Sequence, residues 1–276
     1  MNYTRIAVFY NLNKASVRPL AEQAGDFLRQ QGVEVCLITS LEALANTLPN
    51  VLICMGGDGA MLACARAAAP LNIPVFGVNC GTLGFLAACE PMELHKALTQ
   101  LLDGNCAERT RSLLQASVKA PGRETQTFIA LNDCVLRALS PRAFLISANW
   151  NGDEMPTYFG DGLIVSTPTG STAYSLAANG PIVEPGVEVF ILTPICPHAL
   201  TQRPIILSTQ GRLLLRPSFK NQADRACLSM DGQINLTLPP QAKVEITQSP
   251  LSVRLLCPKE RGFFSILNRK LNWGNR

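Results

Sequence analysis

The sequence predicts an α/β domain built on a parallel sheet, followed by an all-β domain and a C-terminal helix that packs back on the first domain. Over the first hundred residues, short apolar runs alternate with stretches whose apolar residues recur at helical spacing. From about residue 106, strand-like runs follow one another with only turns between them. We expect residues 1–105 with 258–276 to form the first domain and 106–257 the second, since 276 residues exceed the roughly 150 of one domain.

The first domain is expected to alternate strands and helices. Gly32 lies where the first helix would be capped, Pro70 ends the second helix, and Pro91 stands at the start of the third. Strands that are separated by helices pair in parallel, so we expect a Rossmann-like sheet. The expected strands cover 5–10, 33–38, 51–55 and 73–78, and the expected helices cover 17–28, 61–69 and 92–102.

The second domain is expected to consist of strands. Turn signals such as Asn151-Gly152-Asp153 and Asp231-Gly232 separate its apolar runs, which is typical of a sandwich or of stacked sheets. Apolar residues then recur at helical spacing from Phe263 to Trp273, which predicts the C-terminal helix. The strands are expected at 113–118, 128–136, 144–150, 163–166, 205–207, 213–215, 234–238 and 244–246.

The charge and the hydropathy pattern exclude several classes of protein. The 24 basic and 20 acidic residues give a net charge of +4 without a Lys/Arg block, so we expect no nucleic-acid partner. The apolar run from Ile6 to Tyr10 is too short for the core of a signal peptide, and no run of about 18 apolar residues occurs. We therefore expect a soluble, cytoplasmic protein with no membrane partner.

The ten cysteines are expected to be reduced and structural. Most lie inside apolar runs, where cysteine acts as a small hydrophobic residue, and none forms a C-x-x-C pair. Since the chain has only two histidines, His95 and His198, a zinc cluster is not expected.

The first chemical signal is Gly56-Gly57-Asp58-Gly59, which stands between a buried strand and a helix. Ligands of an open α/β sheet bind at the carboxyl ends of its strands, and glycines let the backbone approach a phosphate closely. A carboxylate beside phosphates is repelled unless it binds a metal or accepts a proton. Asp58 therefore favours chemistry over simple anion binding, although a tight turn with a helix-capping Asp remains the alternative.

The second signal is Gly160-Asp161-Gly162 followed by a hydroxyl-rich segment, residues 166–175. Six of these ten residues are Ser or Thr, and Tyr174 adds a seventh hydroxyl and a ring on which a base can stack. Because buried hydroxyl groups need partners, the segment is predicted to be a recognition loop. The alternative is a capped helix start with ordinary Ser/Thr turn bonds.

Two smaller features also fit a nucleotide. The stretch Asn79 to Phe85 follows the strand at 73–78, so it should lie at the same sheet edge as Asp58. Asn132-Asp133 interrupts an apolar run, and an amide beside a carboxylate can accept hydrogen bonds from a ribose diol. A bulge or hairpin corner would explain Asn132-Asp133 equally well.

Taken in order along the chain, these motifs resemble those of the bacterial NAD kinases. The resemblance extends over nearly the whole length and includes the block 160–181 and the stretches 193–197 and 231–233. It implies phosphorylation of NAD at the 2′-hydroxyl of its adenosine ribose, with ATP or polyphosphate as donor and NADP as product. It also implies a divalent metal, expected to be Mg²⁺ carried on the donor phosphates and not fixed by the protein, and a homodimer or homotetramer.

The resemblance also assigns roles to individual residues. Asp58 would be the catalytic residue, which orients the 2′-hydroxyl and takes its proton late in the reaction, because a carboxylate is a weak base. Gly56, Gly57 and Gly59 would shape the loop around the donor phosphates, and NAD would lie between the two domains. The expected NAD contacts are Asp58, Gly59, Asn132, Asp133, Arg142, Asp161, Thr169, Thr172, Ala173, Tyr174, Ser175, Leu176, Ala177 and Gln233.

One residue departs from the family pattern, which has Thr where this chain has Ala60. The missing hydroxyl would bond a donor phosphate or cap the helix, and one neutral hydrogen bond is worth about 0.5–1.5 kcal/mol. We therefore expect an active enzyme with a raised KM for the phosphate donor.

Three other functions are weighed against this one. A lipid or sugar kinase of the same superfamily would share residues 56–59 but not the block 160–181. A sensor that binds NAD(H) or NADP(H) without turnover would account for Ala60 but not for Asp58. A dehydrogenase would show G-x-G-x-x-G after the first strand, where Asn11-Leu12-Asn13 stands instead.

Overall fold

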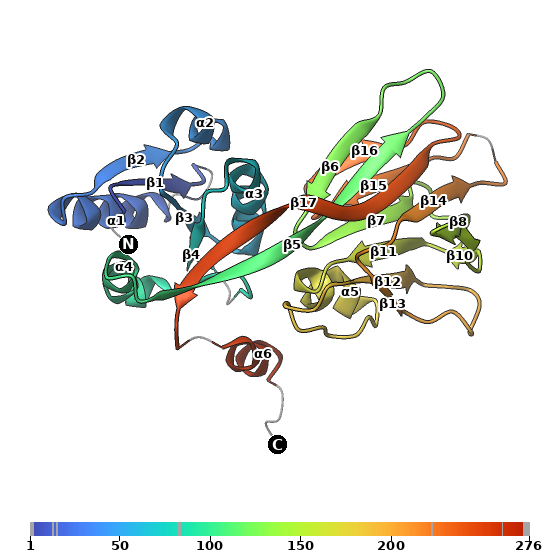
Figure 1. Cartoon of the computed structure of the whole chain (residues 1–276). Coiled ribbons are helices and arrows are strands. Elements are labelled where there is room, and N and C mark those ends of the chain that lie inside the picture. The colour runs from blue at the N-terminus through green and yellow to red at the C-terminus, as the bar shows by residue number, and fades with distance from the viewer. Residues whose placement is uncertain are drawn as a thin grey trace. The chain divides into compact units, whose positions relative to one another are not determined.

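The computed structural model describes residues 3–12, 14, 16–81, 84–221, 223–260 and 262–272. The chain divides into two compact units, Met1–Arg111 with Leu251–Arg276, and Ser112–Pro250. The divisions fall inside two long strands, β5 (Cys106–Lys119) and β17 (Lys243–Pro258), each of which begins in one unit and ends in the other (Figure 1). The sequence places the boundaries about six residues away from these divisions, at 105/106 and 257/258, where the composition changes.

The first unit contains the predicted parallel sheet. Its strands are β1 (Arg5–Tyr10), β2 (Glu34–Ile38), β3 (Val51–Gly56) and β4 (Val75–Asn79), together with the end of β17. They lie in the order β17-β4-β3-β1-β2, and the pairs in this order are parallel. β3 and β4 are buried along their whole length, as expected for strands that are covered on both faces.

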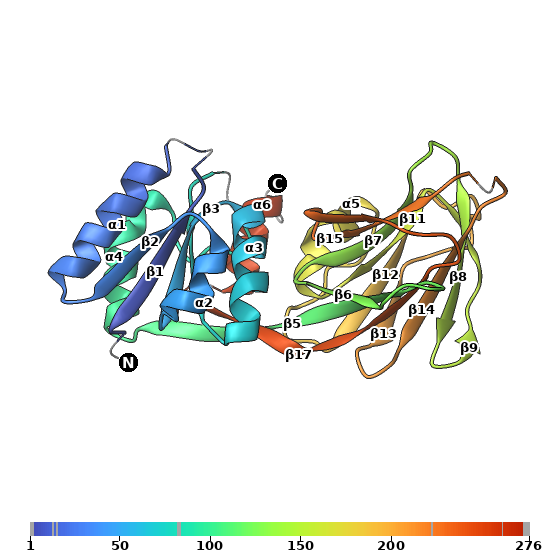
Figure 2. The same cartoon turned by 90° about the horizontal axis from the view of Figure 1, so that it is seen from above.

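Helices cover the two faces of this sheet. Helices α1 (Arg18–Gln30) and α4 (Leu94–Leu102) pack on the face that carries Ile6, Val8 and Ile53. The short α2 (Leu44–Thr47) and α3 (Asp58–Ala68) lie on the opposite face (Figure 2). The sequence predicts the second helix from residue 61, but α3 already begins at Asp58, which places this carboxylate in the first helical turn.

The C-terminal helix α6 (Phe263–Leu271) belongs to the first unit, as predicted. Arg269 forms an ion pair with Glu90 (2.5 Å), and Lys270 Nζ lies 5.3 Å from the ring centroid of Phe85. Trp273, at which the sequence ends this helix, lies outside the described residues. No helix in the described part of the chain is long and apolar enough to cross a bilayer.

The second unit is all-β, as predicted. Its further strands are β6 (Gln126–Ala130), β7 (Asp133–Ala138), β8 (Phe144–Trp150), β9 (Asp153–Glu154), β10 (Tyr158–Gly160), β11 (Gly162–Ser166), β12 (Val189–Ile195), β13 (Ile205–Ser208), β14 (Leu213–Ser218), β15 (Ala226–Met230) and β16 (Ile234–Thr237). One antiparallel sheet has the order β13-β12-β11-β7-β15-β16. Its buried side chains share one core with those of β8, β14 and β17, so the two layers pack face to face.

The structure differs from the sequence prediction at several places in this unit, since the run 128–136 is divided and the strands β9, β10, β12 and β15 were not expected. The run 128–136 forms two strands, β6 and β7, because the chain turns between them at residues 131–132. Strand β12 forms although it contains Pro194, and proline lacks the N–H group of a strand residue. Pro194 is accommodated opposite Leu163 of β11.

Candidate active site

Asp58 lies where β3 turns into α3. Gly56 ends the strand, Gly57 caps the helix, and Gly59 follows Asp58 in the first helical turn. The half-buried carboxylate of Asp58 accepts hydrogen bonds from the backbone N–H groups of Phe85 (3.3 Å) and Leu86 (3.4 Å). Both are longer than the ordinary limit of about 3.2 Å. The carboxylate is therefore oriented by these groups without being locked by them.

Gly84 allows the carboxylate of Asp58 to approach this segment. A Cβ atom at position 84 would overlap Oδ1 of Asp58, whereas a Cβ atom at Gly81 would meet nothing within 4 Å. Thr82 and Leu83, which stand between these glycines in the predicted motif, lie outside the described residues. The absence of a side chain at Gly84 therefore leaves the space that the carboxylate of Asp58 occupies.

The end of β4 lies beside the end of β3, as the sequence predicts. Asn79 is in register with Gly56, and the N–H of Cys80 donates to the carbonyl oxygen of Gly56 (3.0 Å). The buried amide of Asn79 donates through Nδ2 to the carbonyl oxygen of Gly81 (3.2 Å), while its Oδ1 has no partner among the described residues. A polar oxygen is thus available at the same sheet edge as Asp58.

In the second unit, Asn132 and Asp133 lie at the start of β7. The carboxylate of Asp231, directly after β15, accepts the backbone N–H groups of Leu131 (3.1 Å), Asn132 (2.7 Å) and Asp133 (3.2 Å). The N–H of Asp231 donates in return to the carbonyl oxygen of Asp133 (2.9 Å). Burial, with a smaller contribution from the charge of Asp231, raises the pKa of Asp133 to about 7.

The hydroxyl-rich segment is held largely by bonds within this unit. Thr167 donates through Oγ1 to the carbonyl oxygen of Leu131 (2.5 Å), and Ser171 donates to that of Pro168 (2.6 Å). Ser175 shares a hydrogen bond with Thr193 (2.9 Å), and both hydroxyls are buried. Many of the Ser and Thr hydroxyl groups of this segment therefore bond within the unit, as the alternative of ordinary Ser/Thr bonds expects.

Close backbone packing joins the segment to Asn132. A Cβ atom at Gly170 would overlap the carbonyl oxygen and Cα of Asn132, and the N–H of Thr167 donates to the same carbonyl (2.9 Å). Residues 131–133, 166–171 and 231 therefore form one interlocked group, which we call the anchored cluster.

A hollow of about 480 Å³ opens beside the anchored cluster. It brings together four of the predicted NAD contacts, and Tyr174 is 44% exposed there. Its lining residues are Asn132, Asp133, Val135, Arg137, Ala173, Tyr174, Ser229, Asp231, Gly232 and Asn235. The other predicted contacts of this unit lie outside that lining: Arg142, Asp161, Thr169, Thr172, Ser175, Leu176, Ala177 and Gln233.

Sequence reasoning gave no role to Asp231 or Gly84. The sequence marks Asp231-Gly232 as a turn and as part of the family stretch 231–233, and the positive φ angles of the two residues, 51° and 66°, fit a turn. The only sequence signal for a binding role is that this turn follows a buried strand. Gly84 stood inside the predicted motif without a function of its own.

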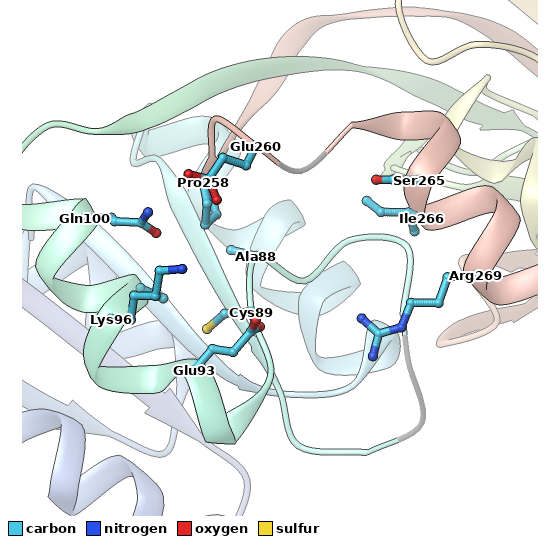
Figure 3. A pocket seen from close by; sticks show the side chains of 11 residues that line it. Ala88, Cys89, Glu93, Lys96, Gln100, Pro258, Glu260, Ser265, Ile266 and Arg269 are labelled. Carbon is cyan, nitrogen blue, oxygen red and sulfur yellow. The ribbon is translucent and has the colours of Figure 1, made fainter.

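A second hollow, of about 270 Å³, lies within the first unit. Figure 3 shows α4 and α6 on either side of it, with Lys96 on α4 and Arg269 on α6. None of the predicted site residues lines it, and its charged side chains are exposed and of both signs. The lining comprises Ala88, Cys89, Glu93, Lys96, Ala97, Gln100, Pro258, Glu260, Ser265, Ile266 and Arg269.

Family models for two domains match this chain. The model described as the ATP-NAD kinase N-terminal domain matches residues 30–106, and that of the ATP-NAD kinase C-terminal domain matches residues 131–257. Together they cover most of the chain, including Asp58 and the anchored cluster.

Similar proteins are NAD kinases as well. That of Citrifermentans bemidjiense is 33% identical over 287 residues, and that of Geobacter sulfurreducens is 34% identical over 284 residues, each across 99% of both chains. Among solved structures, the yeast NADH kinase complexed with NADH has a TM-score of 0.89 at 23% identity, covering 100% of this chain and 90% of its own. The NAD kinase from Archaeoglobus fulgidus in complex with ATP has a TM-score of 0.79 at 25% identity, covering 98% and 100%.

Proposed function

The chain belongs to the NAD kinase family, and from this premise we propose how its residues divide the work of phosphorylating NAD. As a phosphotransferase it transfers a phosphoryl group from ATP to the 2′-hydroxyl of the adenosine ribose of NAD, and the product is NADP. The matches to both domain models, together with relatives that cover 99% of the chain, carry this function. The same matches favour an NAD kinase over a lipid kinase, a sugar kinase or a dehydrogenase.

The first unit supplies the groups that meet the reacting oxygen. We assign the donor phosphates to the backbone of Gly56, Gly57 and Gly59, where the N-terminus of α3 favours negative charge. Asp58 directs the 2′-hydroxyl toward the transferred phosphorus and takes up its proton as the new bond forms. This role is supported by the carboxylate geometry, because an ionised carboxylate has about four acceptor positions and two N–H groups occupy only part of them.

The second unit supplies the groups that hold NAD. Asn132 and Asp133 accept hydrogen bonds from the ribose hydroxyls, and the ring of Tyr174 stacks on the adenine. The hollow beside the anchored cluster supports this assignment, since all three side chains line it. Contacts with NAD at the remaining positions are proposed on the family resemblance: Arg142, Asp161, Thr169, Thr172, Ala173, Ser175, Leu176, Ala177 and Gln233.

We propose that Mg²⁺ reaches the site on the phosphates of ATP. The described residues include no group of three His, Cys, Asp or Glu side chains that could hold a metal ion. Mg²⁺ keeps several waters and is commonly bound through substrate phosphates with one or two carboxylates, which suits a site that offers Asp58 alone. The ion would neutralise charge on the donor phosphates.

We further propose a cytoplasmic homodimer or homotetramer. All ten cysteines are free thiols, as expected in a reducing compartment. Ile205 and Ile206 are 41% and 51% exposed on β13, an edge strand of the antiparallel sheet, and Leu200 nearby is 86% exposed. Exposed apolar groups on a sheet edge favour contact with a second copy, and light scattering coupled to gel filtration measures the resulting mass.

A purified-protein assay tests the function. NAD or NADH is combined with ATP or polyphosphate, with and without Mg²⁺, and NADP or NADPH is measured by an enzymatic cycling assay. We expect NADP from NAD and ATP only when Mg²⁺ is present. Tight binding of NAD without turnover under any combination would instead support a nucleotide sensor.

A further inference from the structure

We propose that Asp231 is a positioning residue for NAD binding, because its carboxylate fixes the directions in which Asn132 and Asp133 leave the backbone. This inference rests on the proposed function, in which those two side chains hold the ribose. Although Asp231 is among the residues that line the hollow, we assign it no contact with NAD. It acts through the backbone of residues 131–133.

Three hydrogen bonds carry the inference. The two carboxylate oxygens of Asp231 accept the N–H groups of three successive residues, at 3.1, 2.7 and 3.2 Å. These donors lead into β7, whose first residue is Asp133, at the point where the apolar run would otherwise continue as one strand. Hydrogen bonds from backbone N–H groups to a carboxylate are charge-assisted and about twice as strong as neutral ones. Since the group is almost completely buried, water cannot replace them.

The remaining contacts of the anchored cluster leave this segment little freedom. Thr167 holds the carbonyl oxygens of Leu131 and Asn132, and Gly170 lies against the backbone of Asn132. The hydroxyl-rich segment therefore binds the backbone carbonyl groups of residues 131–132, and Asp231 binds the backbone N–H groups of residues 131–133. Within residues 131–133, the side chains of Asn132 and Asp133 are the ones that line the hollow.

Asp231 also acts on Asp133 electrostatically. Its negative charge adds to burial in raising the pKa of Asp133 to about 7. The other charged or titratable groups around Asp133 are Arg137 of β7 and Tyr174 of α5 (Tyr174–Ala177), which line the same hollow, and the buried thiol of Cys134. Only the ionised form of Asp133 accepts with both oxygens, so the affinity for NAD should rise as the pH increases through about 7.

Asn is the informative substitution at position 231. The residue has a φ of 51°, and Asn adopts this left-handed region more readily than most residues. Asp231→Asn removes the charge and turns one acceptor into a donor that faces N–H groups. Asp231→Glu keeps the charge but displaces the carboxylate by one methylene, so it separates the electrostatic effect from the positional one. Asp153→Asn, in the exposed strand β9 of the same unit, is the matched control.

The experiment measures NAD dissociation constants by calorimetry between pH 5.5 and 8.5, together with hydrogen exchange at Leu131, Asn132 and Asp133. For Asp231→Asn we expect about ten- to hundredfold weaker NAD binding, faster exchange at the three amides, and a pH midpoint lowered by about half a unit or more. The KM for ATP should change by less than about twofold. Asp231→Glu should weaken NAD binding while keeping the pH midpoint of the wild-type protein. If the Asn variant does not fold, the Glu variant alone tests the proposal.

Two results would overturn the proposal. One is wild-type affinity, midpoint and exchange in both variants. The other is an equal rise of the KM values for NAD and ATP with an unchanged midpoint, which indicates general destabilisation. Failure of the wild-type protein to bind NAD would count against the proposed function instead, and the exchange measurement would then still report whether Asp231 holds residues 131–133.

Discussion

The two units use an aspartate at a strand end in opposite ways. In the first unit the half-buried Asp58 accepts two long hydrogen bonds, at 3.3 and 3.4 Å, so much of its acceptor capacity remains. In the second unit Asp231 is 8% exposed and accepts three backbone N–H groups, one of them at 2.7 Å. The same side chain thus serves either as a group that meets a substrate or as a group that builds the surface for one.

The difference shows which acidic residues of a chain are candidates for chemistry. A buried carboxylate that accepts three backbone N–H groups stabilises a loop and keeps little acceptor capacity for a ligand. A carboxylate held by few, weak bonds beside a helix N-terminus can still accept a proton or a hydroxyl group. Both occur after buried strands, so position in the sequence does not distinguish them.

The largest expected effect is that of Asp58→Asn. The amide keeps the shape of the carboxylate but takes no proton from the 2′-hydroxyl, and proton transfer by a positioned side chain is worth roughly 10²–10⁴ in rate. We expect kcat to fall by that factor, while NAD binding changes by only a few fold. Steady-state kinetics and calorimetry measure both. Asp103→Asn, an exposed residue of the same unit, serves as the control, and near-normal turnover of the Asp58 variant would refute its role.

The second effect concerns stability and Asp133. With its pKa raised to about 7 by burial and by Asp231, the folded protein keeps a proton that the unfolded chain loses near pH 4. Stability therefore falls as the pH rises from about 4 to 7 and is level above that window.

Asp133→Asn removes the free-energy cost of ionising the buried Asp133. We expect the variant to be more stable than wild type at pH 8, by up to about 4 kcal/mol, and to gain much less at pH 5. Scanning calorimetry at both pH values measures the difference. An equal effect at pH 5 and pH 8 would show that Asp133 titrates normally.

The third effect tests how Asp58 is positioned. Gly84→Ala adds a methyl group that overlaps Oδ1 of Asp58, so the carboxylate must move. A displacement near 1 Å costs up to about 10²-fold in rate, and we expect kcat to fall about ten- to hundredfold. Gly81→Ala is the matched control, because its methyl group meets nothing within 4 Å. Equal kinetics of the two variants would mean that the approach at Gly84 is unimportant.

The smallest expected effect is that of Ala60→Thr. The added hydroxyl lies in the first turn of α3 and supplies a hydrogen bond worth about 0.5–1.5 kcal/mol. We expect kcat/KM for ATP to rise by about two- to tenfold with the KM for NAD unchanged. Ala60→Val, which adds similar bulk without a hydroxyl, is the control. Identical values for wild type and the Thr variant would show that the hydroxyl is dispensable here.

Much of the first unit was predictable because its signals are local. The buried runs at β3 and β4 are continuous, and Gly56 to Gly59 stand between a strand and a helix in the printed sequence. The start of α3 was placed three residues too late, since glycines are poor helix residues and obscure the first turn.

The division of the run 128–136 was left open by the sequence, which offers a corner at Asn132-Asp133 only as an alternative to a ribose contact. Its residues are apolar on both sides of Asn132-Asp133, and the turn is stabilised by Asp231, which lies 99 residues beyond Asn132. The same holds for Gly170, whose partner is the backbone of Asn132, and for Gly84, whose partner is Asp58.

The types of residue at each strand end, the order of the motifs and the alternation of strands and helices follow from the amino-acid sequence, because they depend on neighbours along the chain. Folding in three dimensions is needed to leave Asp58 with open acceptor positions and to surround Asp231 with backbone N–H groups. The N–H groups that bond to each carboxylate come from segments distant in sequence. The number of acceptor positions that remains on each aspartate is therefore set only when the chain has folded.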